Sequence, residues 1–149
     1  MEMSQVRDYI QARMAIVEPN LDEWVDSLSN IGNIPATELD NSYHITLNAG
    51  PTTNDQGTWI ETQQSVTLTI FKYGFNDPQD TRDELMETAN CIRLDMINPL
   101  NVEAFKSAND SNIEAVQFVA ITPSEIDASN DNVLQVEIEL IVRLFFGVT

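Results

Sequence analysis

The sequence predicts an α+β domain in which two helices pack on one face of a four-stranded, mostly antiparallel sheet. Three observations support this prediction: two segments carry apolar residues every three or four positions, the final segment alternates apolar and polar residues, and polar turn residues separate the segments. The expected order is helix, strand, strand, helix, strand, strand. Because 149 residues suffice for one buried core and are too few for two ordinary domains, we expect a single domain over residues 1–149.

The first expected helix covers about residues 3–17 and ends before Pro19, which cannot continue a helix. Its apolar stripe repeats at helical spacing and consists of Met3, Val6, Ile10, Met14 and Val17. Residues 20–28 could add a short helical turn capped by Asn20. Residues 29–41 mix Gly, Pro, Asn and acidic residues, so we expect a connecting loop there.

Two strands are expected next, over residues 43–47 and about 58–73, with turn residues at 49–57 between them. Within the second strand, only residues 66–70 alternate in the way that predicts one buried face. The earlier part of this strand is polar on both faces, and it could therefore extend beyond the core.

The second expected helix starts at a capping box, residues 81–84, in which a hydroxyl and a carboxylate each bond a free backbone N–H. Its buried stripe comprises Leu85, Ala89, Ile92 and Met96. We expect Pro99 to end this helix. A polar link over residues 101–112 then leads to a third strand over 113–122, which Pro123 closes.

The last expected strand, residues 134–146, has the most regular alternation in the chain. It is ~43 Å long at ~3.3 Å per residue. A globular chain of this size is roughly 38 Å across, so the strand either bends around the core or reaches past it. One face of the strand is apolar throughout. The other face mixes Glu137, Glu139 and Arg143 with Ile141 and Phe145, and such a face suits a subunit contact better than bare solvent.

The charge balance argues against several classes of function. Seven Lys and Arg stand against 24 Asp and Glu, which gives a formal net charge of −17. The chain therefore lacks the cations that bind nucleic acid or anionic membranes. Its apolar runs are far shorter than the ~20 residues that span a bilayer. The first residues have neither the basic nor the apolar region of a signal peptide, so we expect an intracellular protein without a membrane partner.

No residue pattern predicts a catalytic site or a cofactor. His44 is the only histidine, and it is expected to be a half-exposed residue of the first strand rather than part of a catalytic triad. Cys91 is the only cysteine, which excludes an internal disulfide, and it is expected to be a small packed thiol beside the buried stripe of the second helix. We therefore expect no catalytic residues.

One turn imitates a metal-binding loop without completing it. Asp127, Ser129 and Asp131 match the first ligand positions of a calcium loop. The match then fails, because Asn132 replaces the required glycine and Ile138 replaces the final carboxylate. We expect an ordinary turn rich in Asx residues and no metal. A small carboxylate-based enzyme or ligand-binding module, with or without a divalent ion, remains the alternative from another functional class.

The whole layout resembles the tail terminator and tail-completion proteins of long-tailed bacteriophages. The resemblance rests on the order of elements, the chain length, the polar hairpin at residues 43–73 and the alternation at 134–146. It implies a structural virion protein, assembled in the host cytoplasm, that forms a ring with copies of itself, commonly a hexamer. Such a ring caps the tail tube and joins it to the head–tail connector protein. A tail-tube or connector-completion subunit is the alternative within the virion.

The side chains expected at the subunit or partner interface are large groups on a partly polar face: Trp59, Phe71, Ile141 and Phe145. Simple burial under another part of the chain is the other explanation for them. The acidic residues expected to line a channel are Glu61, Glu137 and Glu139. A negative channel would let genome DNA pass without specific binding, while apolar contacts between subunits overcome their repulsion.

Overall fold

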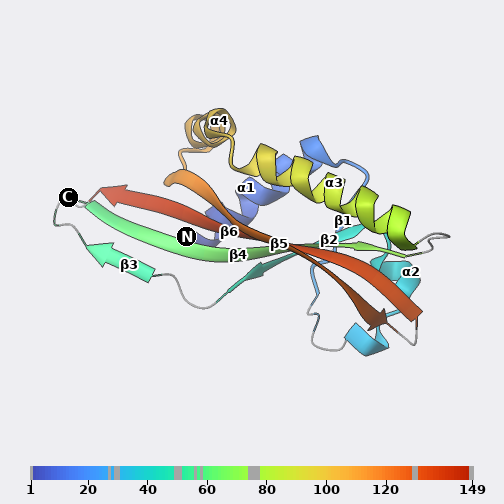
Figure 1. Cartoon of the computed structure of the whole chain (residues 1–149). Coiled ribbons are helices and arrows are strands. Elements are labelled where there is room, and N and C mark those ends of the chain that lie inside the picture. Colours follow the sequence, from blue (N-terminus) through green and yellow to red (C-terminus); the bar gives the residue numbers. More distant parts are fainter. Residues whose placement is uncertain are drawn as a thin grey trace.

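The computed structural model describes residues 2–26, 28, 31–48, 52–55, 57, 59–73, 78–128 and 131–147. It is an α+β structure in which helices lie on one face of a twisted sheet, and a short helix lies at one end of the other face (Figure 1). The elements in chain order are α1 (Glu2–Val17), β1 (Asp22–Glu23), a 3-10 turn (Ile31–Asn33), α2 (Ala36–Leu39), β2 (Ser42–Leu47), β3 (Thr52–Asp55), β4 (Trp59–Lys72), α3 (Pro78–Met96), α4 (Pro99–Asn109), β5 (Ile113–Ala128) and β6 (Asp131–Gly147).

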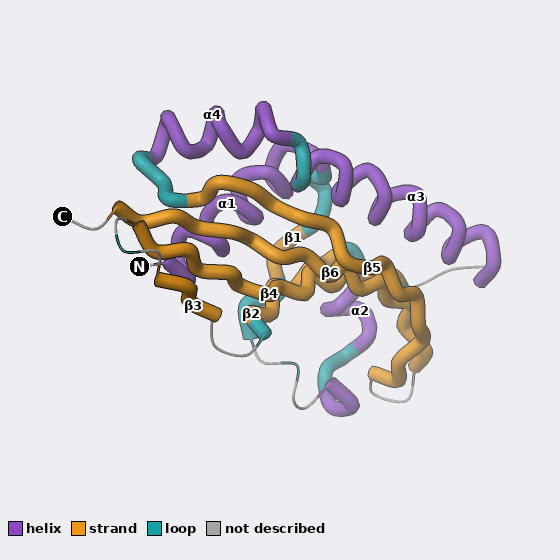
Figure 2. The backbone as a smooth tube through the Cα atoms, turned by 60° about the vertical axis from the view of Figure 1, so that its left-hand side comes forward, coloured by secondary structure: helices purple, strands orange, loops and turns teal. Residues whose placement is uncertain are grey.

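The sheet is mixed. Its main run is β1-β2-β4-β6-β5, and β3 adds a sixth strand beside β4. The β1–β2 pair is parallel, while the other pairs are antiparallel. The β4–β6 ladder has no register shift and runs from the pair Trp59–Gly147 to the pair Lys72–Leu134. Near the turn that joins them, β5 and β6 curve away from the helix layer (Figure 2).

The main core lies between the sheet and the helices α1, α3 and α4, on what we call the first face. The alternation of β6 is confirmed, because its apolar residues Leu134, Val136, Ile138, Leu140, Val142 and Leu144 are at most 1% exposed. The stripe expected on the second helix is also confirmed: Leu85, Ala89, Ile92 and Met96 are buried against this face. Polar Thr62 and Gln64 are buried here too, so the polar half of β4 lies within the fold.

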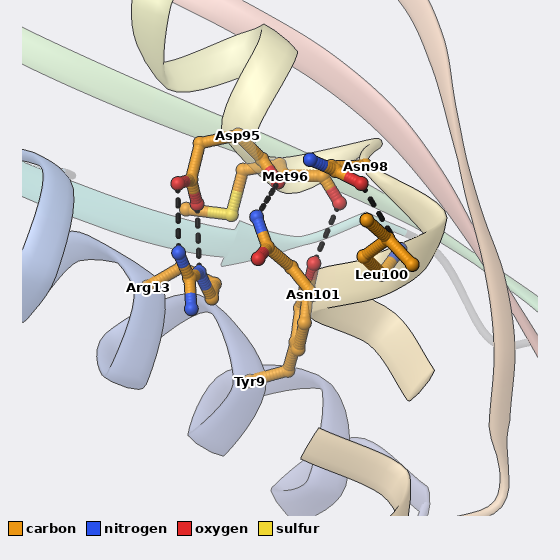
Figure 3. A network of polar contacts seen from close by, with 7 residues as sticks. All are labelled: Tyr9, Arg13, Asp95, Met96, Asn98, Leu100 and Asn101. Atoms are coloured by element: carbon orange, nitrogen blue, oxygen red, sulfur yellow. Dashed lines mark hydrogen bonds and ion pairs between the residues drawn. The ribbon is translucent and has the colours of Figure 1, made fainter. Parts of the chain in front are cut away.

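A polar network joins the three helices of the first face (Figure 3). Tyr9 in α1 donates its hydroxyl hydrogen to the carbonyl oxygen of Met96 at 2.7 Å. Arg13 in α1 makes two hydrogen bonds, of 2.7 and 2.8 Å, to the carboxylate of Asp95 in α3. Asn101 in α4 donates to the Asp95 carbonyl oxygen at 2.9 Å. The end of α3 is therefore tied to both neighbouring helices.

The expected four-stranded sheet with two helices is wrong in its number and order of elements. Residues 22–23 form a parallel strand rather than a helical turn, because the amide of Trp24 bonds the carbonyl of Tyr43 at 2.7 Å. The expected turn at 49–57 contains β3, and the expected loop at 29–41 contains α2 and a 3-10 turn. The expected polar link at 101–112 mostly forms α4, with Asn98 as its N-cap and Pro99 in its first turn.

Three local expectations are also wrong. The second expected helix begins at Pro78 rather than at the capping box, since Pro is tolerated in the first turn of a helix. Pro123 does not close the third strand, because β5 is an edge strand whose outer side needs no ladder bond there. Cys91 is exposed, because it lies about 100° around the helix from Ile92.

No helix in the described ranges has the length and apolar character needed to cross a membrane.

Candidate functional site

The candidate site is the face of the sheet opposite the three large helices, which we call the second face. One end of it is covered by the chain itself. Ala36 and Leu39 of α2 pack there against Phe71 of β4 and Val133 of β6. Trp24, Leu28, Ile31, Ile34 and Tyr73 surround this small cluster. The rest of the second face has none of the helices α1 to α4 over it (Figure 1).

The end of the second face that the described helices leave uncovered, which we call the open half, combines apolar groups with one ion pair. Ile141 and Phe145 of β6 lie here and are partly exposed. Between them, the Arg143 guanidinium donates to the Glu61 carboxylate at 2.8 Å and lies 5.5 Å from the centre of the Phe145 ring. Gln63 donates to the same carboxylate at 2.9 Å. The open half is therefore a mixed surface whose charges compensate each other.

The electrostatics of the open half follow from these contacts. The hydrogen bond from Gln63 and the hydrogen bond from Arg143 favour the ionised carboxylate and lower the pKa of Glu61 below its ordinary value. Glu61 is only 8% exposed although it is charged. A buried carboxylate normally needs a partner, and the pairing across the β4–β6 ladder supplies it.

The middle of the second face holds a shallow polar depression of about 200 Å³. Its lining residues come from β2 and the residue after it, from β4 and β6, and from the segment after β1, and they are Leu28, Thr46, Asn48, Thr67, Thr69, Gln135 and Glu137. Asn48 donates to the Thr67 hydroxyl at 2.8 Å, and Gln135 donates to the Glu137 carboxylate at 3.1 Å. We call this feature the polar depression.

A second cavity of about 200 Å³ lies between the ends of α1, α3 and β4. Lys72 lines it, but its ammonium group is already engaged by Asn41 at 3.1 Å and by Asp40 at 3.5 Å. Asn41 has a left-handed backbone, with φ of 58°. The only Lys or Arg among the described residues that line this cavity is therefore already engaged within the chain.

His44 contacts the segment after β1. It lies in β2, partly exposed as expected, and its Nδ1 is 2.7 Å from the carbonyl oxygen of Trp24. A carbonyl oxygen can only accept, so Nδ1 carries the hydrogen and the contact holds the segment after β1 against the sheet. Cys91 is on α3, in the helix layer.

Within the described ranges, no three His, Cys, Asp or Glu side chains gather in a way that could hold a metal ion. The calcium-like turn falls at the β5–β6 connection, where Asp127 opposes Asn132 in the ladder. Ser129 and the side chains of Asp127 and Asp131 lie outside the part of the chain that the structure describes.

The interface residues expected from the sequence occupy different surroundings. Ile141 and Phe145 lie together on the open half. Phe71 is 1% exposed and packs beneath α2, so it is held inside the molecule. Trp59 begins β4 opposite Gly147, and its side chain lies outside the described part.

The expected channel residues separate in the same way. Glu61 is paired with Arg143 on the open half. Glu137 and Glu139 lie further along β6, opposite Thr69 and Thr67, and neither has an ion-pair partner within the described ranges. The sequence analysis missed the polar depression because its walls come from four segments. The alternating threonines of β4 were the available signal, but only the strand register places them beside Glu137.

Neither a protein-family model nor a curated protein matches the chain. Among solved structures, a chain with a similar course of the backbone comes from a structure described as "Virion of native gene transfer agent (GTA) particle". The two chains are 10% identical, the TM-score is 0.42, and the match covers 95% of this chain and 92% of that chain.

Proposed function

We propose that this chain is a structural virion assembly protein of the tail terminator kind, which forms a ring, commonly a hexamer, at the end of the tail tube. The observation that carries the proposal is the open half of the second face. There Ile141 and Phe145 lie on either side of Arg143, on a sheet surface that the described helices leave uncovered. A second copy of the chain is the partner that we assign to this surface.

The composition of the open half fits a subunit contact. Aromatic and arginine side chains in the centre of an interface contribute most of its binding energy, and Phe145 and Arg143 are such a pair. Burying a charge without a partner is costly. Arg143 already has Glu61 as its partner, so a neighbouring subunit can cover both without leaving an unpaired charge.

Strong acidity is compatible with a ring around a channel. Six copies would carry 6 × (−17), or about a hundred negative charges. Of the expected channel residues, Glu61 is neutralised by Arg143, whereas Glu139 has no ion pair within the described ranges. We therefore assign Glu139, two residues from the interface residue Ile141, to the channel wall. A wall of this sign repels phosphate, so genome DNA passes without specific binding.

The partners in this proposal are further copies of the chain, the tail tube protein and the head–tail connector protein. A tail-tube or connector-completion subunit would use the same open half. Binding to isolated tubes and to filled heads separates these roles, because a terminator binds the free end of a finished tube. A completion protein of the connector binds the filled head instead.

The experiment that tests the proposal combines native mass spectrometry with negative-stain microscopy of the full chain. We expect rings for the wild type, and smaller species for Ile141→Asp and for Phe145→Ala. The matched control is Leu100→Asp, which places the same charge at a residue of α4 that is 78% exposed. This control should still form rings. A wild-type chain that stays monomeric at high salt, with and without tail tubes, would refute the proposal.

A further inference from the structure

We infer that the polar depression binds the cationic side chain, lysine or arginine, of a basic segment in a partner protein. The inference deepens the proposed function, because it names the chemistry by which the ring would hold a different virion protein. It also assigns Glu137 to this contact rather than to the channel wall. Three features support it: a hydroxyl oxygen open to the depression, a carboxylate without an ion pair, and Lys and Arg side chains that are already engaged elsewhere in the chain.

The hydroxyl belongs to Thr69, which lines the depression. The residue is only 5% exposed, and its side chain has no hydrogen-bond partner among the described residues. Its hydroxyl oxygen is not among the fully buried side-chain atoms that lack a partner in the described part of the chain, so this oxygen is open to the depression. Its neighbour Thr67, 9% exposed, accepts a hydrogen bond from Asn48. Thr69 therefore presents to the depression an oxygen that a ligand can engage.

The carboxylate belongs to Glu137, which lies opposite Thr69 in the β4–β6 ladder. Gln135 donates one neutral hydrogen bond to it at 3.1 Å, and it makes no ion pair in the described part of the chain. An ammonium or guanidinium group would meet both a negative charge and a hydroxyl oxygen here. Hydrogen bonds between charged partners are stronger than those between neutral ones.

The chain has no spare cation for this site. Six of its seven Lys and Arg are paired with carboxylates, and these are Arg7, Arg13, Lys72, Arg82, Lys106 and Arg143. The seventh, Arg93, lies over the ring of Phe118 at 4.6 Å, on the first face. A second copy of the chain would be equally poor in cations. A cation that complements Glu137 would therefore come from a different, basic protein.

The shape of the depression fits the same ligand. A lysine or arginine side chain buries its methylene groups on apolar surface while its charged end remains among polar groups. Leu28 provides an apolar wall, and Glu137 and Thr69 provide the polar end. The open half differs, because its cation is already present as Arg143. The second face thus offers one surface to a copy of itself and another to a basic partner.

The test measures binding of a hexalysine peptide to the full-length chain by calorimetry at low salt. Glu137→Gln removes the charge and Thr69→Val removes the hydroxyl at nearly constant volume. The matched control is Glu87→Gln, an exposed carboxylate in the helix layer. We expect each depression variant to weaken binding about fivefold or more, as loss of a charge-assisted contact does. The control variant should bind the peptide as the wild type does. The same peptide with acetylated lysines should not bind, because it lacks the lysine charge.

Two results would overturn the inference. If Glu87→Gln weakens binding as much as Glu137→Gln while Thr69→Val changes nothing, the peptide binds the acidic surface as a whole. If Mg²⁺ or Ca²⁺ alone saturates the site and displaces the peptide, the depression is a divalent cation site. Peptide binding does not depend on ring formation, so a monomeric chain that binds hexalysine would refute the ring and leave this site standing.

Discussion

Tyr9 has no exposed surface, and its hydroxyl provides the hydrogen bond to the Met96 carbonyl at 2.7 Å. Its ring also meets Phe105 edge to face, with centroids 5.3 Å apart. We expect Tyr9→Phe to lower the free energy of unfolding by about 1–2 kcal/mol, since it leaves a buried carbonyl without its donor. Urea denaturation measures this loss. Tyr73→Phe is the control and should be nearly neutral, and equal losses in both variants would contradict the assignment.

Burial also raises the pKa of Tyr9 well above its ordinary value. The folded state therefore holds the neutral phenol, and the stability it contributes is present below the unfolded pKa of about 10 and lost as the pH rises above it. We expect the wild type to lose more stability than Tyr9→Phe when the pH rises from about 9 to about 11. Denaturation curves at both pH values test this, and parallel losses in the two proteins would contradict it.

The stability that Glu61 contributes depends on pH with the opposite sign. Its hydrogen bonds to Gln63 and Arg143 lower its pKa in the folded state. Stability from this group is present above the unfolded pKa of about 4.3 and is lost as the pH falls through the lower, folded value. We expect Glu61→Gln to flatten the loss of stability between about pH 5 and about pH 3. Glu87→Gln is the control, and an unchanged acid profile in Glu61→Gln would show that the pair contributes nothing.

At this scale, sequence analysis predicted residues whose burial follows from a local period and missed those whose partner is distant. The stripe with Leu85 and Met96 follows from helical spacing alone. The Glu61–Arg143 pair is separated by 82 positions and depends on the register of β4 against β6. A shift of one residue would place these side chains on the other face. The pattern of the sequence does not determine that register.

Among the elements, α4 was missed because Pro99 was expected only to end the preceding helix. Asn98 caps this helix by accepting from the Leu100 amide at 3.0 Å, and Pro99 lies in its first turn. Asn followed by Pro is as good a start signal as a stop signal. The strands were predicted better, because the period of β6 is uninterrupted. β1 and β3 have two and four residues, and strands this short carry too few positions to show a period.

The cap of α4 is testable on its own. We expect Asn98→Ala to lower the free energy of unfolding by about 1 kcal/mol, because the Leu100 amide in the first turn loses its side-chain acceptor. Chemical denaturation followed by circular dichroism measures it. Asn90→Ala, an exposed position inside α3, is the control and should be neutral or slightly stabilising. Equal effects in both variants would contradict the capping role of Asn98.

For the whole molecule, the proposed ring makes a prediction about salt. Each subunit carries −17, and six of its seven Lys and Arg are already paired with carboxylates of their own chain. Contacts between copies would then rest on apolar groups such as Ile141 and Phe145, while charge opposes assembly. The screening length falls from about 30 Å at 0.01 M salt to about 3 Å at 1 M, so we expect assembly to strengthen as salt is added.

Light scattering of the full chain across this salt series measures the effect. A double variant, Glu87→Gln with Glu103→Gln, reduces the charge at two exposed helix positions away from the second face. It should assemble at lower salt than the wild type, because the same apolar contact then works against less repulsion. Ile141→Asp should stay dissociated throughout. If added salt instead dissociates the wild-type oligomer, ion pairs between subunits stabilise it. The open half is then not the surface that joins the subunits.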